Sequence, residues 1–401
     1  MKTIMRVIPL FVLFMVGTYF LPRFFDNEQA GSIVTKENIV SEKAMDSFPK
    51  ESTEMEQTEL PAEGYAYYIN QPVDDFIEIF GQPEKKEAES NGKQRWMYGK
   101  DNQHAFQIGI EHEQIQDILV TGSDLDVAPF KINMSRGEMY QSASFYPTFE
   151  LNVQQQTYQL ELSENQLHHL PLVAFDNQAY AAIYMDGSTN EINAIHYMSA
   201  ANLLYAGLYD STPVIPEKEQ QSFVDATAKE QNIIEQVIVM LNNFREKAGL
   251  APLSIDLTMS AMGYAVFDYQ QEHREEMENS KETPEEDSSK RNVIVHEFSD
   301  REQENQISQE SSQDSSSDQN AETLLDEALL KQFLKEKQID QQKVRLFYAP
   351  LNQEPATLVP YWFTYKQMQA LLMDHKMSRI GIAIKQQHIL LLLDDGSVTA
   401  Y

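Results

Sequence analysis

Histidine and carboxylate side chains are the residues of this chain that could do chemistry, because it holds nine histidines, 62 acidic residues and no cysteine. Without cysteine there is neither a disulfide framework nor a thiol nucleophile. The adjacent pair His168-His169 and the closely spaced Asp124 and Asp126 are the first candidates for a metal site. Neighbouring residues of a strand point to opposite sides, so we expect His168 and His169 not to share one ion. Asp124 and Asp126 lack the sixth-position glycine and closing glutamate of a calcium loop, so we expect them to shape a turn.

The remaining candidate histidines are scattered along the C-terminal half. His273 lies in a charged run, His296 is followed by glutamate in a low-complexity stretch, and His375 follows a predicted helix. The chain has no Gly-x-Ser-x-Gly motif, no phosphate loop and no His-Glu-x-x-His motif, so no nucleophile or zinc signature stands out. The formal net charge of −31 argues against a nucleic-acid partner.

The beginning of the chain predicts a membrane anchor followed by a spacer. Lys2 and Arg6 precede an apolar run, and no small-residue cleavage site follows it. A basic start before an apolar segment is typical of export signals. The position of these cations predicts that the bulk of the chain lies outside the cytoplasm. We therefore predict a single-pass anchor at residues 1–25, with a cleaved, secreted form as the alternative. Residues 26–62 are acidic and nearly free of aromatic residues, and predict a disordered stalk.

Residues 63–210 predict a strand-rich domain built from two similar halves. Ile69-Asn70-Gln71-Pro72 begins a short helix, and Ile132-Asn133-Met134-Ser135 begins another. Alternating apolar residues then predict strands in each half, with the Asp186-Gly187 turn before the last one. The predicted strands span residues 95–98, 105–110, 115–121, 157–162, 172–175, 179–185 and 192–198.

A helix–loop–helix segment organises the C-terminal half, residues 231–401. Gly249 can end the first helix in a left-handed conformation, and Asp256 can cap the second. Residues 211–230 contain two prolines among acidic and amide residues, and predict a linker. Residues 274–320 are acidic and rich in serine and glutamine, and predict a disordered insert. Beyond the insert we expect a helix at 324–333, a strand at 344–349, a helix at 363–374 and a hairpin of 380–384 with 389–393.

Several stretches resemble known families. Asn242-x-x-Arg245-x-x-x-Gly249-Leu250-x-Pro252-Leu253-x-x-Asp256 is similar to the opening of a CAP domain, the domain of cysteine-rich secretory, antigen 5 and pathogenesis-related 1 proteins. Arg379-Ile380-Gly381-Ile382-Ala383 resembles its end. Phe80-Gly81-x-Pro83, Trp96-x-Tyr98-Gly99 and the stretch from Gly122 to Ile132 resemble the CAP-associated N-terminal domain of bacterial proteins. The resemblance implies an α+β fold, in which the two-repeat domain precedes a CAP-like α-β-α sandwich, and the lack of cysteine points to a bacterial, Gram-positive branch.

CAP domains commonly have a cleft in which two histidines and two acidic residues can hold a divalent cation. By resemblance, the slot for the first histidine falls near Val266, and the second slot holds Tyr365, Lys366 and Gln367. Valine and glutamine do not replace imidazole as ligands. We therefore predict a degenerate CAP domain with no catalytic residue, no metal ligand and no cofactor. His375 is the alternative centre, for a site built from other residues.

The leading functional hypothesis is a non-enzymatic, membrane-anchored extracytoplasmic protein that binds a protein or a cell-envelope component. One alternative is a CAP-type hydrolase with a non-standard site. The other is a lipid-binding module, in which the aromatic runs Phe347-Tyr348 and Tyr361-Trp362-Phe363-Tyr365 would line a pocket. Such aromatic runs more often belong to a core, and we expect that role here.

Overall fold

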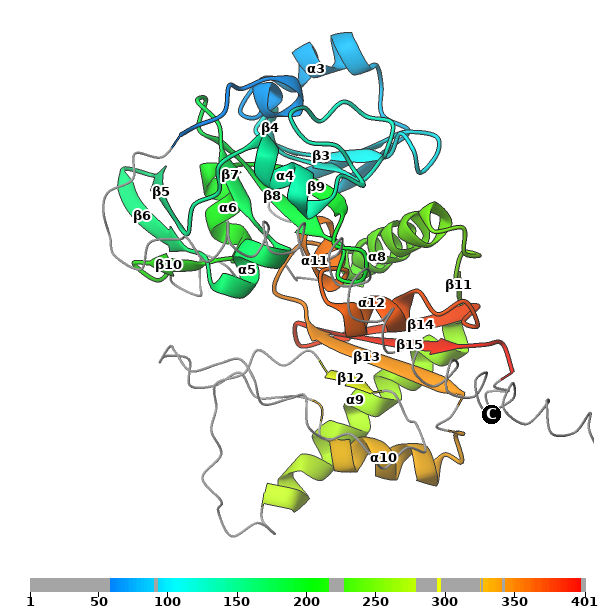
Figure 1. Ribbon diagram of the computed structural model, residues 1–401. Coiled ribbons are helices and arrows are strands. Elements are labelled where there is room, and N and C mark those ends of the chain that lie inside the picture. Colours follow the sequence, from blue (N-terminus) through cyan, green and yellow to red (C-terminus); the bar gives the residue numbers. More distant parts are fainter. Residues whose placement is uncertain are drawn as a thin grey trace, which may run out of the picture. The chain divides into compact units, whose positions relative to one another are not determined.

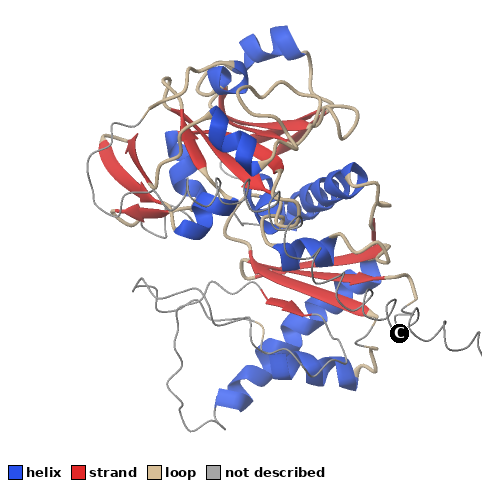
Figure 2. Cartoon of the chain, in the orientation of Figure 1, coloured by secondary structure: helices blue, strands red, loops and turns tan. Residues whose placement is uncertain are grey.

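The computed structural model describes residues 58–89, 93–215, 227–278, 294–296, 325, 327–340 and 343–397. The predicted anchor lies outside these residues, as does the predicted stalk up to residue 57. No helix of the described ranges is long and apolar enough to cross a membrane. Helices and sheets occur in both halves, which confirms the predicted α+β class (Figures 1 and 2).

The N-terminal half contains a seven-stranded antiparallel sheet of order β1-β2-β3-β4-β9-β8-β7 and a three-stranded sheet of order β10-β6-β5. Its elements are η1 (Gly64–Tyr68), α3 (Val73–Phe80), β1 (Lys85–Ala88), β2 (Gln94–Tyr98), β3 (Phe106–Glu111), β4 (Gln114–Val120), α4 (Arg136–Ser142), β5 (Thr148–Val153), β6 (Gln156–Glu161), α5 (Glu164–His169), β7 (Leu172–Ala174), β8 (Ala179–Met185), β9 (Ile192–Ser199), α6 (Ala200–Ala206) and β10 (Asp210–Thr212).

The two sequence repeats have the same local hydrogen bonding. Asn70 and Asn133 both adopt left-handed backbone angles, with φ of 64° and 69°, a conformation that asparagine tolerates. The Asn70 amide donates to the Ile115 carbonyl at 2.7 Å, and the Asn133 amide donates to the Ile192 carbonyl at 2.7 Å. Each repeat thereby fixes the start of its helix to a later strand, and these two strands, β4 and β9, pair at the centre of the sheet.

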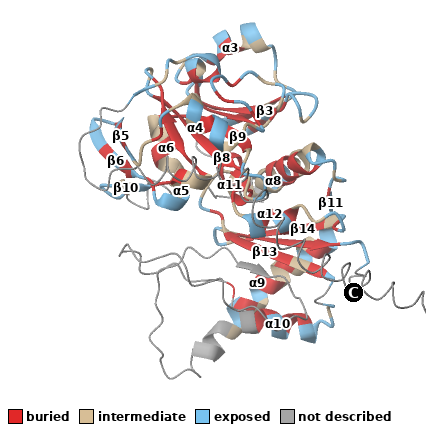
Figure 3. Ribbon diagram, viewed as in Figure 1, coloured by how far each residue is buried: buried red, intermediate tan, exposed pale blue. Residues whose placement is uncertain are grey.

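One face of the seven-stranded sheet carries the apolar core of this half. Cross-strand neighbours on that face form a continuous apolar row, in which Trp96, Ile108, Ile118, Tyr197 and Ala181 follow one another across five strands. These side chains pack with buried residues of η1, α3 and α4, and Figure 3 shows β8 and β9 coloured mostly as buried. The opposite face is also buried along β8 and β9, and it carries the polar residues described below.

The C-terminal half is a five-stranded sheet of order β11-β14-β15-β13-β12 between two layers of helices. α9 and α10 share a core with one face, while α8, α11 and α12 lie on the other side (Figure 1). Its elements are α8 (Thr227–Lys247), β11 (Ser254–Ile255), α9 (Leu257–Glu278), β12 (Ile294–His296), α10 (Glu327–Glu336), β13 (Val344–Pro350), α11 (Pro355–Trp362), α12 (Lys366–Leu372), β14 (Arg379–Lys385) and β15 (His388–Asp394).

The residues that carry the CAP resemblance hold this sandwich together. Arg245 is buried, and its guanidinium donates to backbone carbonyls that include those of Leu372 at 2.7 Å and Met377 at 3.0 Å. Asp256 Oδ1 accepts from the Thr258 amide at 2.8 Å and so caps α9. Its second oxygen accepts from Arg379 Nη1 at 2.9 Å. The motif therefore joins the α8–α9 connection to the last hairpin.

The predicted linker and the predicted insert differ from the structure. The expected linker at 211–230 is shorter, because β10 includes residue 212 and α8 begins at residue 227. The expected insert at 274–320 contributes the end of α9 and the strand β12, whose Val295 pairs with Phe347 of β13. β-branched residues such as Ile294 and Val295 favour a strand even inside a polar stretch.

The end of the expected stalk is attached to the N-terminal half. The Leu60 amide donates to the Ala174 carbonyl, and the Asp176 amide donates to the Leu60 carbonyl, both at 2.9 Å. The helix expected at 363–374 is shorter and follows a further helix, α11. Pro355 lies in the first turn of α11, where proline is tolerated, but Pro360 lies inside it.

Candidate functional site

The first slot of the CAP cation site is part of the core. Val266 lies on α9, is 0% exposed and belongs to the cluster that joins α9 and α10 to the sheet. α9 approaches β14 closely, since a Cβ added at Gly381 would lie 2.4 Å from the carbonyl carbon of Met259. Val266 is therefore surrounded by apolar side chains of this cluster and not by a polar cleft.

The second slot lies against a turn of the N-terminal half. Lys366 and Gln367 are exposed at the start of α12. The Gly187 amide donates to the Phe363 carbonyl at 2.9 Å, and a Cβ at Gly187 would lie 2.6 Å from the Lys366 nitrogen. Ser188 Oγ donates to Gln369 Oε1 at 2.6 Å. The backbone of this slot is therefore used for contact with the Asp186-Gly187 turn.

The other C-terminal histidines lie apart from one another. The His375 side chain is 76% exposed, with Nδ1 3.8 Å from Asp374 Oδ1. His273 stacks on Tyr269 with ring centroids 4.0 Å apart, and His296 is an edge-strand residue. Within the described part of the chain, no group of three or more histidine or acidic residues could hold a metal ion.

The histidine pair of the N-terminal half lies on a helix, and the strand assumed for it was wrong. Ser163 and Gln166 form a capping box that starts α5, which includes His168 and His169. His168 Nδ1 lies 3.4 Å from Arg136 Nη1. Burial, and next the Arg136 guanidinium, lowers the pKa of His169. In the loop after β4, Asp126 Oδ1 accepts from the Ala128 amide at 3.2 Å, a turn contact of the kind expected.

A group of charged side chains that the sequence did not single out lies on the second face of the seven-stranded sheet. Arg95 of β2 is 0% exposed. Its Nε donates to Glu89 Oε1 at 2.9 Å, its Nη2 donates to Glu354 Oε2 at 2.8 Å, and its Nη1 donates to Asp117 Oδ1. We call these four residues, together with Lys93, His196 and Asn202, the buried charge cluster.

Gly109 makes the central ion pair possible. Strand register places Arg95, Gly109 and Asp117 opposite one another on β2, β3 and β4. Because glycine has no side chain, the guanidinium can reach across β3 to the carboxylate. A Cβ at Gly109 would lie 1.9 Å from Asp117 Oδ2 and 3.0 Å from Arg95 Nη1.

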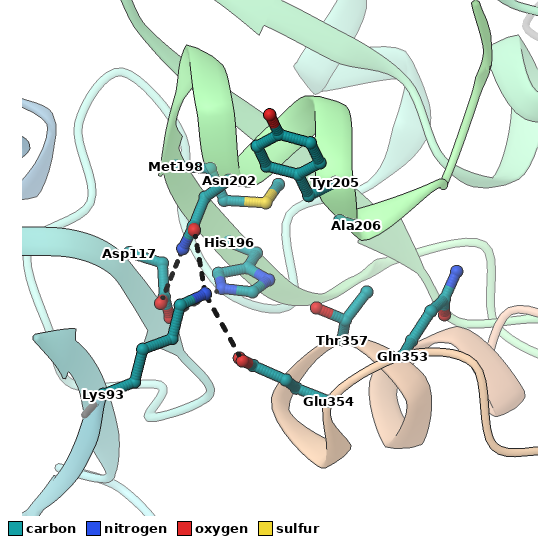
Figure 4. Close-up of a pocket in the computed structure, with 10 residues that line it drawn as sticks. All are labelled: Lys93, Asp117, His196, Met198, Asn202, Tyr205, Ala206, Gln353, Glu354 and Thr357. Carbon is teal, nitrogen blue, oxygen red and sulfur yellow. Dashed lines mark hydrogen bonds and ion pairs between the residues drawn. The ribbon is translucent and has the colours of Figure 1, made fainter. Parts of the chain in front are cut away.

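The second oxygen of Asp117 and its neighbours extend the cluster toward α6 and α11 (Figure 4). Asn202 Nδ2 donates to Asp117 Oδ2 at 3.0 Å, and His196 Nε2 lies 3.0 Å from Asp117 Oδ1. Lys93 Nζ donates to Asn202 Oδ1 at 3.4 Å and lies 3.6 Å from Glu354 Oε1. Glu354 precedes the first residue of α11, so this helix of the C-terminal half completes a cluster that begins in the N-terminal sheet.

The charges of the cluster shift one another's protonation. Burial would raise the pKa of Asp117, but the Arg95 guanidinium and His196 hold it below its ordinary value. Burial raises the pKa of Glu89 to about 7, against the opposing effect of Arg95. Despite burial, the surrounding carboxylates, first Asp117, raise the pKa of Arg95. The pKa values of Glu89 and Asp117 are thus shifted in opposite directions, so Glu89 retains a proton more readily than Asp117.

The cluster borders a small cavity, which limits its chemistry. His196 Nδ1 is buried and has no hydrogen-bond partner among the described residues. The cavity lined by His196, Lys93, Glu354 and Thr357 has a volume of about 20 Å³, enough for about one water molecule. A carboxylate–histidine pair can act as a general base on water, but a space of this size admits no substrate. The arrangement is suited to holding helices and strands together.

A sequence signal for the cluster was present. Asp117 and His196 interrupt the strands Gln-Ile-Gln-Asp-Ile-Leu-Val and Ile-Asn-Ala-Ile-His-Tyr-Met-Ser, which are otherwise largely apolar. A polar residue inside a buried strand needs a partner, so each interruption predicts a contact. The partner Glu354 could not be inferred, because it lies 259 residues from Arg95 along the chain.

Comparison with known proteins agrees with this architecture. Residues 69–209 match the family described as CAP-associated N-terminal. The C-terminal half has the α-β-α sandwich, and similar solved structures are CAP-type, SCP-containing proteins. Residues 69–209 therefore carry the CAP-associated N-terminal domain that the resemblance implied, and the chain shares the fold of these solved CAP-type structures.

Three individual proteins illustrate the relationship. The chain is 26% identical over 267 residues to the uncharacterised membrane protein YlbC of Bacillus subtilis (strain 168), which covers 64% of this chain and 72% of that protein. A cysteine-rich secretory protein of Staphylococcus aureus has a TM-score of 0.59 at 16% identity, covering 84% of this chain and 97% of that one. An extracellular SCP-domain protein of Bacillus anthracis has a TM-score of 0.57 at 17% identity, covering 86% and 99%. At such identities the two structures show a shared fold.

Proposed function

We propose that this protein is a membrane-anchored extracytoplasmic binding protein, and that its CAP-like half recognises a protein or a cell-envelope component without catalysis. The observation that carries the proposal is the surroundings of the two positions where the resemblance places the histidines. Val266 is enclosed in the core, and the backbone at Lys366 contacts the Gly187 turn. A cation site requires imidazole and carboxylate ligands that converge on one point.

The cellular location in this proposal rests on the chain's first residues and on its relatives. Lys2 and Arg6 before an apolar run support an anchor with the bulk outside. The Bacillus subtilis relative is named a membrane protein, and the Bacillus anthracis structure is named an extracellular protein. The full-length chain should remain in the membrane fraction, and a mature N-terminus near residue 30 in the culture medium would contradict the anchor.

The lipid-binding alternative has less support, because most rings of the aromatic runs pack inside the protein, while Tyr361 and Tyr365 are half-buried. Trp362 is 0% and Phe363 1% exposed. Trp362 contacts Phe347 with ring centroids 4.7 Å apart, and Phe363 contacts Phe244 at 4.4 Å. These rings fill the space between α8, α11 and β13.

Calorimetric titration with zinc and with calcium tests the non-enzymatic proposal. The full chain in detergent micelles should bind neither ion at micromolar or lower dissociation constants, because the exposed His375 belongs to no group of three or more ligand-type side chains among the described residues. The variants His375→Ala and, as a matched control, the exposed His104→Ala should behave like the parent protein. Micromolar binding that His375→Ala abolishes and His104→Ala preserves would refute the proposal and favour the hydrolase, with His375 at its centre.

A further inference from the structure

The N-terminal half carries a groove that has no part in the buried charge cluster. It is formed where residues 62–68 meet the end of α3 and the loop after β4, and its volume is about 540 Å³. This volume falls in the range of about 300–1,000 Å³ that is usual for ligand pockets. The lining residues are Ala62, Glu63, Gly64, Tyr65, Tyr67, Tyr68, Phe80, Asp124, Leu125 and Asp126.

Aromatic rings with fixed neighbours form one side of the groove. Tyr67 is 56% exposed, and its ring meets that of Tyr68 edge-on with centroids 5.3 Å apart. Tyr68 in turn meets Phe76 edge-on at 5.0 Å, and Phe80 stacks on Phe76 at 4.1 Å. Rings that are held in place offer contact area at a low cost in conformational entropy.

The charged residues of the groove are all acidic. Glu63, Asp124 and Asp126 are exposed, and none of the ten lining residues is basic. Within the described chain, no lysine, arginine or histidine forms an ion pair with these three carboxylates. Burial raises the pKa of Tyr65, and the negative charge of the Asp126 carboxylate raises it further. The acidic residues of the groove therefore act electrostatically on its aromatic side.

We propose that this groove binds an arginine-bearing peptide segment. Tyrosine faces attract cations, and a guanidinium can stack on a ring while it donates two parallel hydrogen bonds to a carboxylate. The groove is large enough for a neighbouring apolar side chain beside Leu125 and Phe80. Its negative charge disfavours nucleic acid and anionic lipid. This site lies in the CAP-associated domain and does not depend on the function proposed for the CAP-like half.

Fluorescence anisotropy tests the proposal with the full chain in detergent micelles and a labelled Gly-Tyr-Arg-Leu-Arg-Gly peptide. We expect saturable binding that weakens with salt and that fails when glutamate replaces both arginines of the peptide. The double variant Asp124→Asn/Asp126→Asn should weaken binding at least about tenfold, and Tyr67→Ala by about two- to fivefold. The charge-matched control Glu150→Gln/Glu161→Gln, on exposed positions of β5 and β6, should bind as the parent does.

Several results would overturn the assignment. Absence of binding would do so, as would binding that the Asp124→Asn/Asp126→Asn variant leaves unchanged while its unfolding midpoint matches that of the parent. Displacement of the peptide by tetramethylammonium at equal concentration would indicate a site for small organic cations. Binding that appears only after deletion of residues 26–57 would indicate that the chain's own segment occupies the groove.

Discussion

The substitution Gly109→Ala tests whether the buried charge cluster is built around a missing side chain. Gly109 lies between Arg95 and Asp117 in the strand register. The added methyl group would lie 1.9 Å from Asp117 Oδ2 and 3.0 Å from Arg95 Nη1. Its backbone φ is not in the left-handed range, so alanine introduces no backbone strain and the steric conflict is isolated.

The expected loss of stability follows from what the cluster can do to relieve that conflict. If side chains shift while the ion pair survives, overpacking costs about 1–3 kcal/mol. If the pair separates, an uncompensated buried charge costs about 3–5 kcal/mol. Arg95 keeps Glu89 and Glu354 as partners when Asp117 moves, which limits the second cost. We therefore expect Gly109→Ala to lower the free energy of unfolding by about 2–4 kcal/mol.

Urea unfolding of the full chain in detergent micelles, followed by tryptophan fluorescence, measures this loss. Trp96 lies on the strand next to Gly109, so its signal reports on the affected sheet. The matched control is Gly137→Ala on α4, where a Cβ meets no atom within 4 Å. The control should be neutral or stabilised by up to about 1 kcal/mol, since alanine favours helices. A Gly109→Ala protein within about 0.5 kcal/mol of the parent would refute this reasoning.

Three further predictions concern stability. Because the pKa of Glu89 is raised from 4.5 to about 7, its contribution to the free energy of unfolding is complete below pH 4.5 and is lost as pH rises through 7. Glu89→Gln should remove this decline, of at most about 3 kcal/mol, from unfolding free energies measured at pH 5–8. An unchanged slope of the unfolding free energy against pH would contradict the assignment. Deletion of residues 274–320 should lower the midpoint of urea unfolding, since it removes β12, whereas deletion of residues 300–320 should not. Equal unfolding midpoints of the two deletion variants would show that β12 contributes nothing to stability. Gly381→Ala should cost about 2–3 kcal/mol, because its Cβ would lie 2.4 Å from the backbone of Met259, and a loss no larger than that of Gly137→Ala would count against the close α9–β14 contact.

Elements with a clear apolar period were predictable from the sequence. The strand predicted at 179–185 is β8 with the same bounds, and Asp256 caps α9 as expected. Some missed elements had weak or contrary signals, whereas β5 was missed despite its clear apolar alternation. β1, with the sequence Lys-Lys-Glu-Ala, has no apolar alternation and forms by pairing with β2. α11 contains Pro360, which ordinarily argues against a helix.

The candidate site was less predictable than the fold, because its members are joined by tertiary contacts. Arg95 was placed correctly in a strand, but the sequence does not tell which face of that strand is covered, or by what. The structure covers this face with α6 and α11, which supply Asn202 and Glu354. The resemblance implied two histidine slots, and the structure places Val266 in the core and the backbone at Lys366 against the Gly187 turn.

The second histidine slot and the contact between the two halves involve the same elements. Glu354, the residue before α11, binds the buried Arg95, and the connection between α11 and α12 forms the second slot, which contacts the Gly187 turn. Without the C-terminal half, Arg95 would lose a carboxylate partner, and the sheet face at β8 and β9 would lose cover that its buried residues require. The CAP-like half therefore covers part of the CAP-associated domain, and the connection between α11 and α12, where the resemblance places the second histidine slot, makes part of that contact.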